Sequence, residues 1–270
     1  MNSNRIAILS LAVAVASFLY NPISEFLKGE DLRIKTGDNV LISSTFGNLG
    51  FNQFIQINNL GNDKGTIKKI KIYVKRIDNK GLKSIYSAQN FCYDKFLSDN
   101  SPVIIPFAET ILKPNENWSG FVNFYNFSKK EDEYKLSAYK DLINDELDSI
   151  NEVYRFNLIS PSKNCASEKA FNPMKEYIED KLKILETGEY FYLLMAWDDK
   201  KVEPLVTKLY SFSIYPSDLD ILRRNTTELK KGMWMNYFPN NRNFGFLSTL
   251  TEINDSDRIK QLLEEFKRYE

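Results

Sequence analysis

The chain has 270 residues, equal numbers of basic and acidic side chains (36 each) and no histidine. The absence of histidine excludes Ser-His-Asp and Cys-His catalysis, histidine-ligated zinc or haem, and an imidazole pH switch. Because the charges balance, no net field attracts a polyanion, and we expect no nucleic-acid binding. The 14% aromatic content and otherwise ordinary composition indicate a globular chain that is long enough to bury a sizeable core.

The N-terminus carries an uncharged apolar run at residues 6–20, followed by Asn21-Pro22. The run is shorter than the ~20 residues that usually span a bilayer, but nearby apolar residues extend it. We predict an uncleaved single-pass anchor over residues 1–27. The alternatives are a cleaved secretory signal, for which Ala14-Val15-Ala16 offers a cleavage site before Ser17, and a buried or interfacial helix.

Two arguments about membrane orientation oppose each other. Arg5 precedes the apolar run, whereas Lys28, Arg33 and Lys35 follow it, so a Lys/Arg count favours a cytoplasmic C-terminal domain. A short tail before a large domain is the usual form of a signal anchor, however, and long domains cross membranes largely regardless of charge. We therefore expect the large domain on the outer side, exoplasmic or periplasmic.

The segment Phe51–Arg76 predicts two strands joined by a turn into a hairpin at the centre of the fold. In its second strand, Ile70, Ile72 and Val74 share one face, and the other face carries lysines. We expect the first face to meet the sheet that contains Gly188–Trp197, and the lysine face to contact water. Alternation and aromatic density predict further strands at residues 38–46, 82–89, 102–107, 109–112 and 118–125.

Helical periodicity replaces alternation at about residues 128–187. Apolar residues recur there at spacings of three and four, and Asn172-Pro173 is expected to open a second helix. Strand patterning resumes directly after Gly188, so we interpret the helices as an insertion between consecutive strands. The first of these helices is predicted from Leu136, Tyr139, Ile143, Leu147, Ile150 and Tyr154.

The segment Gly188–Trp197 is apolar at both parities, which is typical of a central strand covered on both faces. Alternation returns in Val202–Tyr215, which is expected to pair with it as a hairpin, and a short helix is expected to follow through Leu222. A last helix is predicted from the helical spacing of Ile259, Leu262, Leu263 and Phe266.

These elements predict a mainly β fold, an immunoglobulin-like two-layer β-sandwich with a helical insertion, preceded by one N-terminal membrane helix. The sandwich is expected over residues 28–225, with an aromatic stretch and the C-terminal helix packed on it over residues 226–270. Tyr190 and Tyr192 resemble the tyrosine corner of such sandwiches, although the Cys–Trp–Cys spacing is missing. The likeness is architectural and says nothing about function.

Four aromatic residues in the stretch after the last sandwich strand are the candidate binding residues: Trp234, Tyr237, Phe238 and Phe244. Rings interleaved with asparagine amides suit a peptide, glycan or protein contact, because rings supply contact area and amides supply directional hydrogen bonds. The alternative interpretation is that these rings tuck the C-terminal extension back onto the sandwich.

The remaining reactive side chains indicate little chemistry. Cys92 and Cys165 are too few for a zinc ribbon or an iron–sulfur cluster, and either form one disulfide in an oxidising compartment or remain ordinary thiols. The carboxylate clusters near residues 131–133, 141–148 and 198–199 fit solvated surfaces and contain no EF-hand spacing. Phosphate-loop and dinucleotide-binding motifs are absent, so we expect no cofactor and no bound metal.

We therefore expect a membrane-anchored, non-enzymatic β-sandwich protein that binds other proteins or serves as an assembly module, working through its helical insertion and its aromatic stretch. Its membrane contact is residues 6–20. One alternative is an exported carboxylate-dependent enzyme or glycan-binding protein with a cleaved signal peptide. Another is a structural subunit of a larger envelope assembly.

Overall fold

The computed structural model describes residues 29–96, 102–126, 129–157, 165–198, 202–231 and 245–270. Within these residues the chain is mainly antiparallel β with inserted helices, as the sequence predicted. The predicted anchor at residues 1–27 lies outside the described residues. Among the helices that are described, none is both long and apolar enough to cross a membrane.

Ten strands form one sheet, in the order β11-β1-β2-β8-β5-β4-β9-β10-β12, with β6 paired to β5. A separate two-stranded sheet consists of β3 (Gly65–Ile67) and β7 (Thr110–Leu112). The strands of the large sheet are β1 (Leu32–Thr45), β2 (Asn48–Asn59), β4 (Lys69–Arg76), β5 (Lys83–Phe96), β6 (Pro102–Pro106), β8 (Asn117–Tyr125), β9 (Gly188–Trp197), β10 (Val206–Ile214), β11 (Gly245–Thr249) and β12 (Thr251–Glu252).

The large sheet curves until its edges almost meet, because one stretch of chain pairs with both edges. β11 pairs with β1, and β12, separated from β11 by Leu250 alone, pairs with β10. We expected two separate sheets packed face to face. Hydrogen bonding instead continues from strand to strand, and opposite walls of one nearly closed sheet enclose the core. Both arrangements bury alternate residues of each strand, so alternation alone does not distinguish them.

The predicted Phe51–Arg76 hairpin is wrong in its pairing. Both strands exist, as β2 and β4, but β2 pairs with β1 and β8, whereas β4 pairs with β5 and β9. Strands β8 and β5 therefore lie between the two expected partners. The face of β4 that was expected to pack onto the sheet of β9 belongs to the same sheet, with Ile72 opposite Leu194 in the ladder.

Helices occupy the expected insertion between β8 and β9. They are α2 (Lys130–Asn157) and α3 (Glu168–Leu182), which we call the helical arm. Contrary to the prediction, Asn172-Pro173 does not open the second helix, because Ser167 caps α3 at an earlier position by accepting a hydrogen bond from the Ala170 N–H. The other helices are α4 (Pro216–Glu228), its 3-10 extension η1 (Leu229–Lys231) and α5 (Ser256–Lys267).

Strand β9 is buried on both faces, as its uninterrupted apolar sequence predicted. Tyr192 and Leu194 belong to the main core inside the curved sheet. Leu193 and Met195 point outward into a second, smaller core, which α5 completes with Phe266. The sheet is therefore apolar on both sides along this wall.

The lysine face of β4 is not the wet side that alternation predicted, because α5 and the C-terminal residues cover it. Tyr73 is only 1% exposed. Lys75 Nζ lies 2.6 Å from Glu265 Oε2, and Lys71 Nζ lies 2.6 Å from Glu270 Oε1. The alternation correctly gave the two faces but could not show which distant segment covers the outer one.

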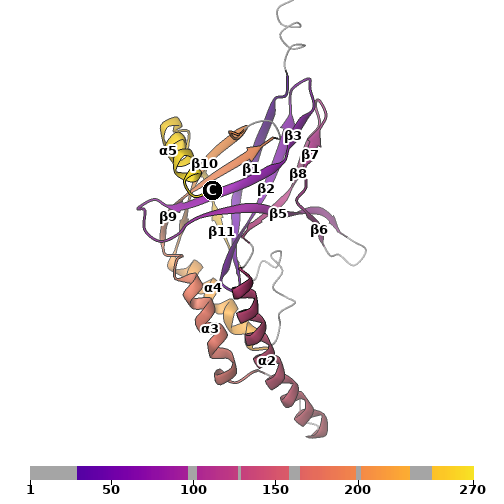
Figure 1. The fold of residues 1–270 in the computed structure, drawn as a ribbon, viewed down its shortest axis with the longest axis vertical. Coiled ribbons are helices and arrows are strands. Elements are labelled where there is room, and N and C mark those ends of the chain that lie inside the picture. Colours follow the sequence, from indigo (N-terminus) through magenta and orange to yellow (C-terminus); the bar gives the residue numbers. More distant parts are fainter. Residues whose placement is uncertain (1–28, 97–101, 127–128, 158–164, 199–201, 232–244) are drawn as a thin grey trace, which may run out of the picture.

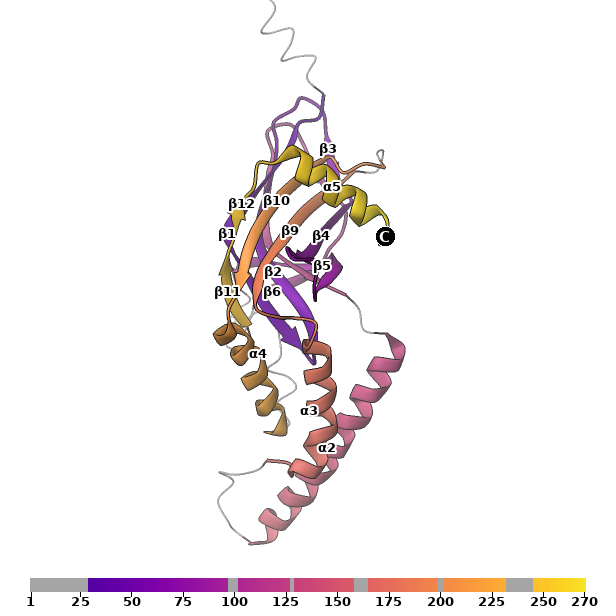
Figure 2. The ribbon, with the colours of Figure 1, turned by 90° about the vertical axis from the view of Figure 1, so that its left-hand side faces the viewer.

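Figures 1 and 2 show how these parts are arranged. Helices α2, α3 and α4 extend together from one end of the curved sheet, and the described chain begins at the opposite end. Helix α5 lies along the outside of the wall formed by β4, β9 and β10. The helical arm is thus the part of the fold farthest from the start of β1.

Candidate functional site

The tight turn between β1 and β2 contacts both helices of the arm. Gly47 has φ +83°, and a Cβ there would lie 2.6 Å from the Cβ of Lys181 on α3, so only glycine fits without displacing the helix. Next to it, the Lys140 ammonium on α2 lies 4.3 Å from the centre of the Phe46 ring, which is a cation–π distance. The strand hairpin therefore fixes the position of the arm on the sheet.

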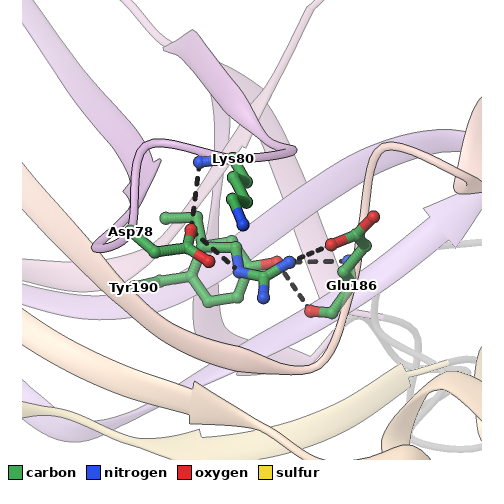
Figure 3. A network of polar contacts seen from close by, with 5 residues as sticks. Asp78, Lys80, Glu186 and Tyr190 are labelled. Atoms are coloured by element: carbon green, nitrogen blue, oxygen red, sulfur yellow. Dashed lines mark hydrogen bonds and ion pairs between the residues drawn. The ribbon is translucent and has the colours of Figure 1, made fainter.

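A polar network ties the far end of α3 to the turn after β4 (Figure 3). Arg76 Nε lies 3.1 Å from Asp78 Oδ1, and the same guanidinium pairs with Glu186 in the connection from α3 to β9. The Tyr190 hydroxyl donates to the Glu186 carbonyl at 2.6 Å. This bond joins the start of β9 to the backbone four residues upstream. It anchors the chain where it leaves the arm and re-enters the sheet.

The two helices of the arm pack through one apolar stripe each. Helix α3 buries Phe171, Met174 and Ile178 completely or almost completely, and α2 buries Ile143 and Leu147. The spacing of three and four correctly predicted the first part of the α2 stripe, where Leu136, Ile143 and Leu147 are buried, whereas the side chains of Ile150 and Tyr154 are not among those described. These apolar stripes are buried between the helices and the end of the sheet. Any binding surface on the arm must therefore be formed by other side chains.

A groove of about 530 Å³ lies on the arm, between the first turns of α3 and the facing part of α2. The rings of Tyr139 and Tyr177 stand in it with centroids 6.0 Å apart. Pro173 has no N–H, so it cannot donate the α-helical hydrogen bond to the carbonyl of Lys169, and both residues line the groove. The groove is lined by Lys135, Tyr139, Lys169, Asn172, Pro173, Glu176 and Tyr177.

The Tyr177 hydroxyl is buried, while its ring lines the groove. Burial, together with the nearby Asp132 carboxylate, raises the pKa of Tyr177 to about 12. A hydrogen bond from Lys181, at 2.9 Å, holds the pKa of Asp132 below its usual value despite partial burial. The groove offers two rings, one amide, two lysines and one glutamate, and the excess of lysine suits a peptide with aromatic and acidic side chains.

The predicted binding residues Trp234, Tyr237, Phe238 and Phe244 lie outside the described residues, and their role stays a prediction. Cys165 is exposed and forms no disulfide with any described side chain. The side chain of Cys92 is not among those described, so the predicted choice between a disulfide and two thiols also stays open.

The expectation that the carboxylate clusters are solvated is met only in part, because Asp132 is half-buried beside Lys181 and Asp198, at the end of β9, is 6% exposed. Asp141, Asp145 and Asp148 are exposed along one helix. Over the described part of the chain, no group of three or more carboxylate or cysteine side chains is placed so that it could hold a metal ion. Sequence reasoning put Tyr139 on the apolar face of α2 but missed Tyr177 and Pro173. The sequence analysis used Pro173 only as the start of a helix. Because Pro173 lies inside α3, it lines the groove together with Tyr177.

The described chain is thus a nearly closed antiparallel β-sheet that carries a helical arm with an aromatic groove. No protein-family model matches the chain, and no curated protein matches it. Among solved structures, the chain is similar to a β-glucosidase from Kluyveromyces marxianus, at 12% identity over 69% of this chain with a TM-score of 0.28. A second structure of that enzyme, in complex with glucose, gives 10% identity over 68% of this chain and a TM-score of 0.24.

The match spans 14% of the length of the enzyme chain in both cases. Likenesses this low do not bear on the fold or the activity of the present chain.

Proposed function

We propose that this chain is a membrane-tethered, non-enzymatic module that binds a partner protein in the groove of its helical arm. The observation that carries the proposal is the pair of tyrosine rings, Tyr139 and Tyr177, at 6.0 Å in a groove of about 530 Å³. The immunoglobulin-like character expected from strand patterning stays a prediction, and the proposed function does not depend on it.

The position of the arm supports this role. With an anchor at residues 1–27, the chain would enter the sheet at the end opposite to α2 and α3, so the groove would face away from the membrane. On the expected outer side of the membrane, this geometry presents the groove to exoplasmic or periplasmic partners. A segment with acidic and aromatic residues would place its carboxylates near Lys135 and Lys169 and its rings against the two tyrosines.

Site-specific photo-crosslinking tests the groove. A photoreactive residue replaces Lys135, which lines the groove, or its neighbour Tyr134, which is 75% exposed and does not line it. We expect a partner adduct from position 135 in membranes, and its loss when Tyr139→Ala and Tyr177→Ala are combined. Circular dichroism of the double variant checks that the helices remain. Equal adducts from both positions would contradict binding in the groove.

The tether is tested separately. We expect the mature chain to retain its N-terminus, to be extracted from membranes only by detergent, and to be cut by protease added from the outer side. A mature chain that begins at Ser17 would replace the anchor by a cleaved signal and favour the exported alternative. Trp234→Ala with Tyr237→Ala tests whether the predicted aromatic stretch adds a second contact to the same partner.

A further inference from the structure

The nearly closed sheet has an opening that is bordered by strand edges. Residues Asn39–Ser43 of β1 pair with β11, but among the described residues the first half of β1, Leu32–Thr36, pairs only with β2. On the other side, β12 pairs with β10 at Tyr210 and Ser211, and the Ile253 N–H donates to the Leu209 carbonyl at 2.8 Å, so the edge of β10 is covered from Leu209 to Ser211. We call the opening between residues 32–38 of β1 and the facing side chains of Lys208, Tyr210 and Glu252 the seam.

The main chain of β1 has hydrogen-bonding groups that face the seam. The Leu60 N–H donates to the Asp31 carbonyl at 2.8 Å, which fixes the phase of the antiparallel ladder between β1 and β2. Because bonded positions alternate along such a ladder, the N–H and C=O groups of Leu32, Ile34 and Thr36 point away from β2, toward β10. Arg33 and Lys35 make the bonds to β2. Within the described part of the chain no strand pairs with these outward donors and acceptors, and we call this stretch the free edge.

The same edge already accepts a strand further along. The Leu250 N–H donates to the Asp38 carbonyl at 2.7 Å, and the ladder with β11 follows directly. A β-bulge between Thr36 and Val40 separates the two halves of the edge. The free half therefore continues a line of pairing that the chain itself completes only over the second half.

A cavity of about 310 Å³ lies at the seam. Its inner side has the apolar side chains of Ile34 and Leu250, which are 4% and 7% exposed. One side-chain bond crosses the seam, from Thr36 Oγ1 to the Tyr210 hydroxyl at 2.8 Å. On the rim, Lys208 pairs with Glu252, whereas Lys35 and Asp38 have no ion pair within the described part of the chain.

We infer that the seam binds an extended segment of a partner protein, which adds as a strand to the free edge of β1. Its alternate apolar side chains enter the cavity beside Ile34, and its outward side chains place an acid next to Lys35 and a base next to Asp38. This is a second binding site, distinct in chemistry from the aromatic groove and independent of it.

A second copy of the chain is a poor occupant of the same edge. Antiparallel pairing of two β1 edges about Ile34 would put Arg33 of each copy directly opposite Lys35 of the other. Like charges at directly opposed positions destabilise a sheet. A segment with the complementary charges meets no such penalty, so charge selects a different protein as the partner.

The test is residue-resolved hydrogen exchange of the full chain in detergent, with a set of capped eight-residue peptides as the probe. Each peptide alternates valine with polar residues and carries one glutamate and one lysine in a different register. In the free protein we expect the amides of Leu32, Ile34 and Thr36 to exchange faster than those of Arg33 and Lys35. The best peptide should slow the first three by about tenfold or more and leave the other two unchanged.

Charge variants identify the register. Lys35→Glu should weaken the best peptide by about threefold, as for an exposed ion pair, and a peptide with lysine in place of its glutamate should recover the loss. Three results would overturn the inference: slow exchange of all five amides in the free monomer, failure of every peptide in the set, or binding that leaves the amides of Leu32, Ile34 and Thr36 unprotected. Protection that appears only in a concentration-dependent dimer would assign the edge to a second copy and also overturn it.

Discussion

Two walls of the same curved sheet satisfy their outward polar side chains in opposite ways. On the wall of β4 and β5, four lysines pair with the carboxylates of Glu265 and Glu270 at the C-terminus. On the wall of β2 and β8, amides pair with one another: Asn52 donates to Asn123, which donates to Asn90 on β5 at 2.5 Å. The lysines are Lys69, Lys71, Lys75 and Lys83.

The difference lies in where the partner comes from. A lysine on a strand cannot be satisfied by another lysine, so the charged wall requires a carboxylate from a distant part of the chain, which α5 and the residues after it supply. An asparagine side chain is both donor and acceptor, so the amide wall is complete within the sheet. The stability of the contact between α5 and the sheet therefore depends on apolar packing and, through the ion pairs, on pH and salt. The stability of the amide row depends on each asparagine in it.

The largest expected effect comes from removing the apolar contact that holds α5. Phe266 is 2% exposed, and its ring lies 5.8 Å from that of Trp197 and 6.3 Å from that of Tyr73. We expect Phe266→Ala to lower the free energy of unfolding by about 3–5 kcal/mol, measured by urea denaturation. Tyr134→Ala, at a position that is 75% exposed, is the control and should change little. A loss below about 1 kcal/mol for Phe266→Ala would mean that α5 is not part of the cooperative fold.

A smaller loss is expected from breaking the amide row at its centre. Asn123 is 2% exposed and bonds to both neighbouring asparagines. We expect Asn123→Ala to cost about 1–3 kcal/mol, because the buried Asn52 donor and the half-buried Asn90 acceptor lose their partner. Ser119→Ala, on the exposed part of the same strand, is the matched control. Equal stability of the two variants would show that the row adds nothing to the sheet.

The smallest expected effect is a pH dependence of stability that comes from the charged wall and not from the amide wall. Burial disfavours the charged forms of Glu265 and Glu270, but hydrogen bonds from the lysines outweigh it, and the pKa of each carboxyl is lowered. Both therefore add stability above the unfolded-state pKa of about 4.3, and this stability is lost as the pH falls through their lower folded-state pKa. Urea midpoints should fall over this acid range, and less steeply in a variant with Glu265→Gln and Glu270→Gln. An unchanged pH dependence in that variant would contradict the role of these carboxylates.

The sequence predicted side-chain faces better than it predicted strand partners. Alternation correctly assigned Ile70, Ile72 and Val74 to the core, because the period of a strand is a local property. It could not predict that β2 pairs with β8 and β4 with β9, since those contacts join residues that are far apart in the chain. The sheet closes through the few residues around Leu250, which pair with β1 on one side and β10 on the other. The sequence of these residues does not predict strands, so it could not distinguish a closed sheet from a sandwich.

The candidate groove was predictable only in part. Helical spacing gave α2 and the position of Tyr139, but the partner ring of Tyr177 depends on how α3 returns along α2. The prediction that Asn172-Pro173 opens a helix rests on the preference of proline for a first turn. Here Ser167 provides the N-cap, and the proline lies further along α3, where it lines the groove.

Strand β1 gives the seam and the arm a common element. Its 14 residues extend from the free edge at Leu32 to the turn at Phe46, where the chain contacts α2 and α3, a path of about 45 Å. If the edge and the groove bind ligands as proposed, the two ligands would contact opposite ends of one continuous strand, on either side of its β-bulge. If either ligand changes the affinity of the other, thermodynamic linkage requires the factor to be the same in both directions. The two partners would then be sensed jointly rather than separately.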